Sequence, residues 1–182
     1  MGSSIAYSLM LMQKGNRILF LEPHQPNVVR AQAEFWDLLP VAKATDNEFG
    51  FMLDVKELDA LAAKPEAKDA AYVLAAGIPR TDISQPKDAL FLPNLKIAQG
   101  IVRRLPKCAR VFVVSNPPVR LAEHLRKKGW NAIPLRACTD NLRAHIGDPQ
   151  AINHAVLARK GWTQWTPAYA CAEEILRTLG NK

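Results

Sequence analysis

Polar residues that could do chemistry are concentrated in a few short segments. The first is AAGIPR at 75–80, in which Gly77 permits a tight turn. The second is SNPP at 115–118, and the third carries Asp140 and Arg143. Asp140 and Arg143 are one helical turn apart, so their side chains would share a face, which an ordinary ion pair within a helix would also explain. A guanidinium group binds a carboxylate in bidentate geometry, so the arginines of these segments could bind an organic acid.

The elements that must position these segments alternate between strands and helices. Apolar runs predict strands at 17–22, 49–53, 69–77, 109–114 and 132–135. Helical spacing predicts helices at 5–12, 26–39, 55–63, 87–105, 119–128, 140–146, 149–159 and 167–179. Pro93 should kink the long helix or mark its true start. Strands that alternate with helices predict an α/β fold, with a parallel sheet covered on both faces.

In order and spacing, the polar segments resemble the lactate/malate dehydrogenase family, in which an AGxxR loop, an SNP turn and a D-x-x-R helix line a nicotinamide site. The resemblance implies a Rossmann-like, doubly wound parallel sheet with C-terminal helices. It places Gly77 beside the nicotinamide ribose, and Arg80 and Arg143 at the substrate carboxylates. It also implies that Asn116 orients the substrate and that Asp140 orients a catalytic histidine.

The chain departs from the family pattern at two positions and returns to it in the tail. Lys87 stands near the place where malate dehydrogenases have a second arginine, and it would be a weaker clamp for a carboxylate. Pro118 is an extra residue in the turn whose proline is often cis in the family. The tail at 160–170, KGWTQWTPAYA, is similar to the segment that opens a long helix in lactate dehydrogenases. The predicted domains are 1–146, of Rossmann-like dinucleotide-binding type, and 147–182, a remnant helical segment of the substrate domain.

The resemblance also implies where a nicotinamide dinucleotide would bind. Gly2 matches the last glycine of the Gly-x-Gly-x-x-Gly fingerprint, which lets a helix N-terminus approach the pyrophosphate. Glu22 ends a predicted strand about twenty residues further on, where the family's acid accepts the adenosine ribose hydroxyls. An ordinary solvated carboxylate would explain Glu22 equally well. The implied cofactor contacts are therefore Gly2, Glu22, Gly77 and Asn116.

The first strand of the family fold would lie before Met1, so we expect this strand to be missing from the sheet. In a 3-2-1-4-5-6 order its absence leaves a gap of about 9–10 Å with unpaired backbone on both sides. Another segment, a partner chain or residues that precede Met1 would have to fill this position.

Reduction of a 2-oxo acid needs a proton donor that titrates near neutral pH. In the family a histidine supplies it, from a glycine-flanked turn that follows the D-x-x-R helix. No such turn follows Arg143, and the four histidines of the chain are His24, His124, His145 and His154. We therefore assign no catalytic residue, and we take Arg80, Asn116, Asp140 and Arg143 as family-matching remnants. The resemblance allows NAD binding, although the missing glycine pair favours its loss.

Composition limits the class of protein. The chain has 182 residues, of which 48% are hydrophobic, enough for one globular domain. No apolar run reaches about 18 residues, so no transmembrane helix is expected. The three cysteines have no CxxC spacing, which favours reduced thiols in a non-secretory compartment: Cys108, Cys138 and Cys171.

The formal net charge is +7, and basic residues gather at 103–110 and 120–128. Such a surface is typical of a mitochondrial matrix protein or of contact with anionic lipid or RNA, although a solvated helix face explains it as well.

These observations predict a catalytically inactive malate/lactate dehydrogenase-like protein, a structural accessory subunit of a larger assembly on the mitochondrial matrix side, with the cytoplasm as the alternative location. One alternative function is an active NAD-dependent malate or lactate dehydrogenase represented by an incomplete chain. Another is a module that senses NAD without turnover.

Overall fold

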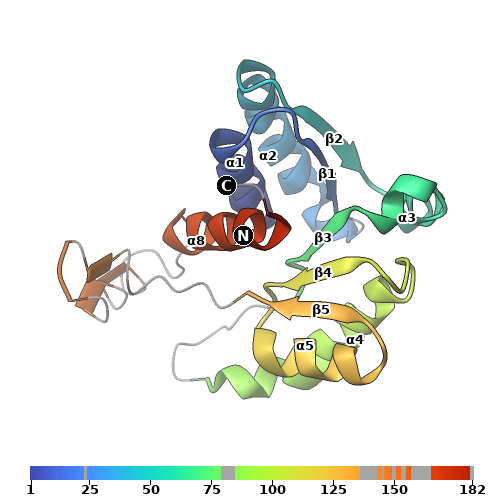
Figure 1. Ribbon diagram of the computed structural model, residues 1–182. Helices are drawn as coiled ribbons and strands as arrows, with labels where there is room; N and C mark the ends of the chain where they lie inside the picture. The colour runs from blue at the N-terminus through green and yellow to red at the C-terminus, as the bar shows by residue number, and fades with distance from the viewer. Residues whose placement is uncertain are drawn as a thin grey trace. The chain divides into compact units, whose positions relative to one another are not determined.

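The structure, a computed structural model, describes most of the chain (Figure 1). The described residues are 1–22, 24–78, 85–135, 143–144, 146–148, 151–152, 155–156 and 165–180. The elements of the amino-terminal half are α1 (Gly2–Met12), β1 (Arg17–Leu21), α2 (Gln25–Ala44), β2 (Glu48–Met52), α3 (Val55–Ala62), the 3-10 helix η1 (Pro65–Lys68) and β3 (Ala71–Leu74). Those of the second half are the 3-10 helix η2 (Lys87–Leu90), α4 (Phe91–Val102), β4 (Arg110–Val113), α5 (Pro118–Lys127), β5 (Asn131–Pro134) and α8 (Trp165–Leu179). The helices predicted at 140–146 and 149–159 lie mostly outside the described residues.

The strands form two sheets, of order β1-β2 and β3-β4-β5. In the second sheet β4 is parallel to both neighbours, with Leu74 opposite Val113 and Arg110 opposite Asn131. The parallel α/β architecture predicted from the sequence is confirmed. Among the described strands, no hydrogen-bonded ladder joins β1 to β3, which is where the predicted strand order has its gap.

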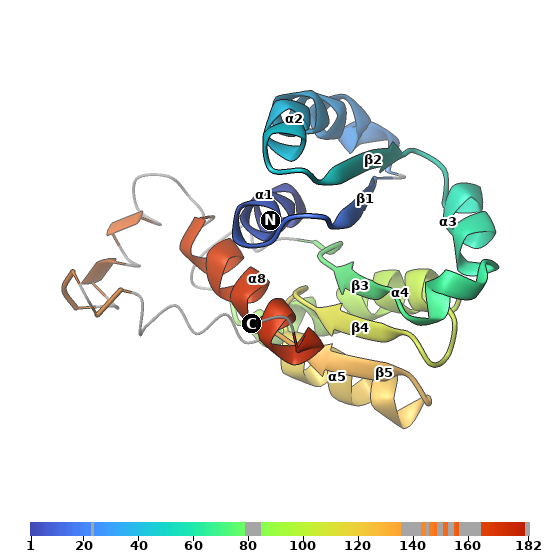
Figure 2. The same cartoon turned by 45° about the horizontal axis from the view of Figure 1, so that its top comes forward.

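The core of the three-stranded sheet is built on β4, whose central side chains have no exposed surface. These are Val111, Phe112 and Val113. Helices α4 and α5 lie alongside the sheet in both views (Figures 1 and 2) and contribute Val102 and Leu121 to the apolar cluster that contains Val111 and Val113. Burial of each such side chain stabilises the fold by about 1.5–3 kcal/mol. The sheet is therefore a firm support for the loops that follow its strands.

The sequence of α5 shows why a helix forms at this place. Pro118 occupies its first turn, where a missing N–H group costs nothing. Leu121, Ala122 and Leu125 are buried and follow helical spacing. Gly129 then adopts a positive φ of 84°, which ends the helix.

Contacts divide the chain into two compact units. Unit 1 comprises 1–18, 34–49 and 137–182, and unit 2 comprises 19–33 and 50–136. Each of these units is made of several segments, whereas the predicted domains are two continuous ranges that meet after residue 146. The predicted boundary stays a prediction.

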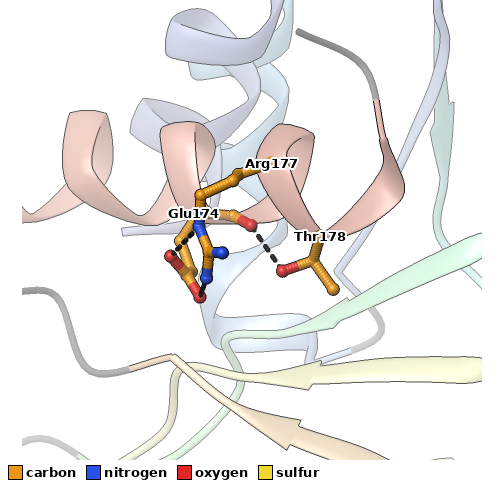
Figure 3. Close-up of polar contacts among 3 residues, drawn as sticks. All are labelled: Glu174, Arg177 and Thr178. Carbon is orange, nitrogen blue, oxygen red and sulfur yellow. Dashed lines mark hydrogen bonds and ion pairs between the residues drawn. The ribbon is translucent and has the colours of Figure 1, made fainter.

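In unit 1 the packing of α1 against α8 joins the two ends of the chain. The rings of Tyr7 and Trp165 meet edge to face, with centroids 5.8 Å apart. On α8, Arg177 forms an ion pair with Glu174, and the Thr178 hydroxyl donates to the Glu174 carbonyl at 2.7 Å (Figure 3). Both contacts join neighbouring turns of the same helix.

Two prolines behave differently in the helices. The helix predicted to end at residue 39 continues through Pro40 as α2, because Pro40 lies on the exposed face, where the lost hydrogen bond is replaced by water. Pro93 lies in the first turn of α4, so it marks the true start of that helix after η2. No described helix is both long and apolar enough to cross a membrane.

The two described cysteines differ in accessibility, and this difference is testable. Cys171 on α8 is 1% exposed, and burial raises its thiol pKa to about 11, whereas Cys108 is exposed. We expect iodoacetamide at pH 8 to alkylate Cys108 in the native protein and Cys171 only after unfolding, as measured by peptide mass spectrometry. Because the folded pKa exceeds the unfolded value of 9.0, the contribution of this thiol to stability is complete below pH 9 and is lost as the pH rises through 11. Equal labelling of both cysteines at pH 8 would contradict the packing of α8.

Candidate functional site

Two of the three segments singled out by the sequence, the loop after β3 and the turn after β4, meet at the carboxyl edge of the three-stranded sheet, within unit 2. Neighbouring parallel strands end at the same edge, so the loop after β3 and the turn after β4 come together there. Ser115 joins them. It is 6% exposed, and its hydroxyl donates to the carbonyl of Leu74 at 3.1 Å and to that of Ala76. The turn after β4 is thereby fixed to the end of β3.

A buried asparagine holds the same two segments from the helix side. Asn94, on α4, is 1% exposed. Its Oδ1 accepts the N–H of Ile78 at 2.6 Å, and its Nδ2 donates to the carbonyls of Ile78 at 3.3 Å and Asn116 at 2.7 Å. One amide therefore links a helix, a loop and a turn. Sequence reasoning missed Asn94. The available signal was an asparagine among the apolar residues of the first turn of α4 (FLPNL), since buried polar groups are hydrogen-bonded.

Gly77 is required for a reason other than the predicted one. Its φ is not among the positive values, so no left-handed turn demands a glycine here. A Cβ atom at this position would instead meet Oδ1 of Asn94 at 3.0 Å and its Nδ2 at 3.1 Å. The close approach of the loop to Asn94 is what excludes a side chain.

The Asn116 side chain faces outward from this framework. Asn116 is exposed, and within the described part of the chain its amide has no hydrogen-bond partner, although its carbonyl is held by Asn94. The peptide bond to Pro117 is cis, as the resemblance implied, and Pro118 begins α5. The exposed amide can therefore donate to or accept from a small ligand at this edge.

Glu22 lies directly after β1, as predicted. Its carboxylate accepts the N–H of His24 at 3.0 Å and the side-chain amide of Asn27 at 3.5 Å. These contacts connect the end of β1 to the start of α2. Its predicted role at a ribose stays a prediction.

The remaining predicted residues are distributed as follows. Gly2 opens α1, and Arg143 is 7% exposed; both belong to unit 1. Arg80, Asp140 and the side chain of Lys87 lie outside the described residues. The structure thus brings together Gly77 and Asn116, and the roles of the other residues stay predictions.

His124 does not lie at this edge. His124 is in the last turn of α5, six residues after Pro118, or about 9 Å along the helix axis. Its Nε2 is 3.2 Å from Nε2 of Gln99, and its ring meets Phe91 with centroids 6.2 Å apart. His24 is exposed beyond β1. His145 and His154 lie outside the described residues. Among the described residues, no group of three acids, histidines or cysteines could hold a metal ion.

Comparison with known proteins supports the fold. No family model matches the sequence, and no curated protein does. Among solved structures, the apo malate dehydrogenase of Picrophilus torridus has a TM-score of 0.72 at 14% identity, over 98% of this chain and 72% of that one. The malate dehydrogenase of Archaeoglobus fulgidus in complex with NADH has a TM-score of 0.66 at 16% identity, over 98% and 74%. The lactate dehydrogenase of Eimeria maxima with NADH and oxamate has a TM-score of 0.57 at 14% identity, over 100% and 65%.

The α/β architecture and these matches define a Rossmann-like fold. More narrowly, the chain has the fold of the malate and lactate dehydrogenases. The fold inferred from three short motifs is therefore confirmed.

A substitution at Gly77 tests the close approach. We expect Gly77→Ala to lower the free energy of unfolding by about 1–3 kcal/mol, because the added methyl group displaces Asn94. Gly100→Ala is the matched control. Gly100 lies inside α4 with nothing near its Cβ position, so the change should raise stability by about 0.5–1 kcal/mol. Urea denaturation measures both, and equal effects would contradict the proposed contact.

Removal of the Asn94 amide tests the link itself. Asn94→Ala leaves buried backbone groups of the loop and turn without partners, which we expect to cost about 2–4 kcal/mol of unfolding free energy. Asn131→Ala, at an exposed position on β5, should change stability by less than about 0.5 kcal/mol. A loss below 1 kcal/mol for Asn94→Ala would show that water replaces the amide.

Proposed function

We propose that this protein is a catalytically inactive protein of malate/lactate dehydrogenase fold that serves as a structural accessory subunit of a larger assembly. The observation that carries the proposal is the sequence after Arg143, which lacks the glycine-flanked turn with a histidine that the resemblance calls for; the position of His124 adds to it. A proton donor for a ketone must lie within hydrogen-bond reach of the reacting oxygen. His124 is instead engaged with Gln99 and Phe91, about 9 Å along α5 from the turn that carries Asn116.

The framework of the carboxyl edge favours a second candidate, an active NAD-dependent malate or lactate dehydrogenase. Asn94 and Ser115 hold the loop and the turn firmly, while the Asn116 amide stays exposed. The solved structures of similar fold include one in complex with NADH and one with NADH and oxamate. This arrangement also suits a module that binds NAD without turnover.

A mitochondrial matrix location and protein partners complete the first proposal. Both are supported by the formal net charge of +7, since a strongly basic protein associates readily with anionic surfaces. Blue native electrophoresis of the endogenous protein, followed by identification of co-migrating subunits in isolated mitochondria, tests both points. Migration as a free protein would overturn the accessory role.

Turnover separates the candidates. We expect the purified full-length protein to oxidise no NADH with either oxaloacetate or pyruvate, as followed by NADH absorbance. Turnover that is lost in Asn116→Ala and retained in His124→Ala would establish the active enzyme. Absence of turnover together with NADH binding, measured by calorimetry and weakened by Asn116→Ala, would instead establish the binding module.

A further inference from the structure

A cavity of about 580 Å³ lies in unit 2 at the amino edge of the three-stranded sheet, at the other end of the strands from Asn116. Its walls come from the end of α3, from η1 and from the turn after α4. Figure 1 shows α3 beyond the amino end of β3. The cavity is a shallow hollow, largely open to solvent, with room for a small ligand.

The charge of this cavity is strongly unbalanced. Four basic side chains and one acidic side chain line it: Lys64, Lys68, Arg103, Arg104 and Asp59. Asp59 pairs with Arg104. The other three basic residues are exposed and form no ion pair within the described part of the chain. Three positive charges therefore surround the cavity without compensation.

A second cavity in the same protein shows that the charge imbalance of the lining does not follow from the volume of the cavity. It has about 620 Å³ and lies in unit 1. Its charged lining consists of Arg17, Lys43, Asp46 and Glu48, and so is balanced. Arg17 and Glu48 form an ion pair at 3.4 Å. Of these two cavities, the amino-edge cavity alone has an excess of positive charge.

The neighbouring Lys107 is engaged outside the cavity. Its ammonium group lies 3.7 Å from the centre of the Trp130 ring and donates to the Lys128 carbonyl at 3.2 Å. The cavity lining does not include it. The three unpaired charges of Lys64, Lys68 and Arg103 thus belong to one hollow, which suits a compact anion.

We infer that the amino-edge cavity binds a small ligand with two or more adjacent phosphate groups. Lysine ammonium groups and arginine guanidinium groups are the side chains that bind phosphate, the latter in bidentate geometry. Leu105 and Pro106 add an apolar wall, against which the rest of the ligand can pack. This site lies away from the carboxyl edge that carries Asn116. The inference does not depend on whether the protein turns over a substrate.

Calorimetric titration of the full chain with inorganic triphosphate tests the inference. Lys64→Gln/Lys68→Gln should weaken binding about tenfold, because two charge-assisted contacts are lost. Lys14→Gln/Lys43→Gln removes the same charge from exposed positions outside the cavity and should weaken binding less than about twofold. Circular dichroism confirms that both variants are folded.

Three outcomes would overturn the inference. Equal weakening in both variants would show attraction to the net charge alone. No heat of binding at millimolar triphosphate would show that the cavity is not a phosphate site. Single-stranded RNA that binds more than about tenfold tighter than triphosphate, and is weakened by the cavity variant, would assign the surface to nucleic acid.

Discussion

The carboxyl edge of the three-stranded sheet depends on one buried amide. Asn94 satisfies backbone groups of both the loop after β3 and the turn after β4. These groups are partly buried, so loss of the amide would leave several of them without a partner, and each would cost up to about 1–3 kcal/mol. The exclusion of a side chain at Gly77 is a second consequence of the same amide.

This amide can hold the loops only because the sheet beneath is rigid. Residues 111–113 of β4 are fully buried, and α4, which carries Asn94, packs through Ala98 and Val102 into the apolar cluster that contains Val111 and Val113. Burial of apolar surface thus fixes the position of α4, and the position of α4 fixes the loops. The amino edge has no such arrangement: its cavity is lined by exposed charges at the ends of α3 and α4.

The alternation of strands and helices could be predicted because apolar periodicity is a local signal. The proximity of Gly77 and Asn116 was implied by the family resemblance, and its physical basis is that loops after neighbouring parallel strands meet at one edge of the sheet. The hydrogen bonds of Asn94 could not be predicted in this way, because its partners are 16 and 22 residues away and no pattern in α4 indicates which residues they are. The passage of α2 through Pro40 was also missed, since tolerance of a proline depends on which face of the helix meets water.

Within the described part of the chain, the hydrogen bonds of the Asn94 side chain go to main-chain atoms of Ile78 and Asn116. Both of these residues turn exposed side chains outward, and Ile78 is 47% exposed. The shape of the edge is therefore independent of which side chains it displays. Mutation at either position can alter what the surface recognises while the backbone stays intact. A fold of this kind can therefore change its ligand without a change in its backbone structure.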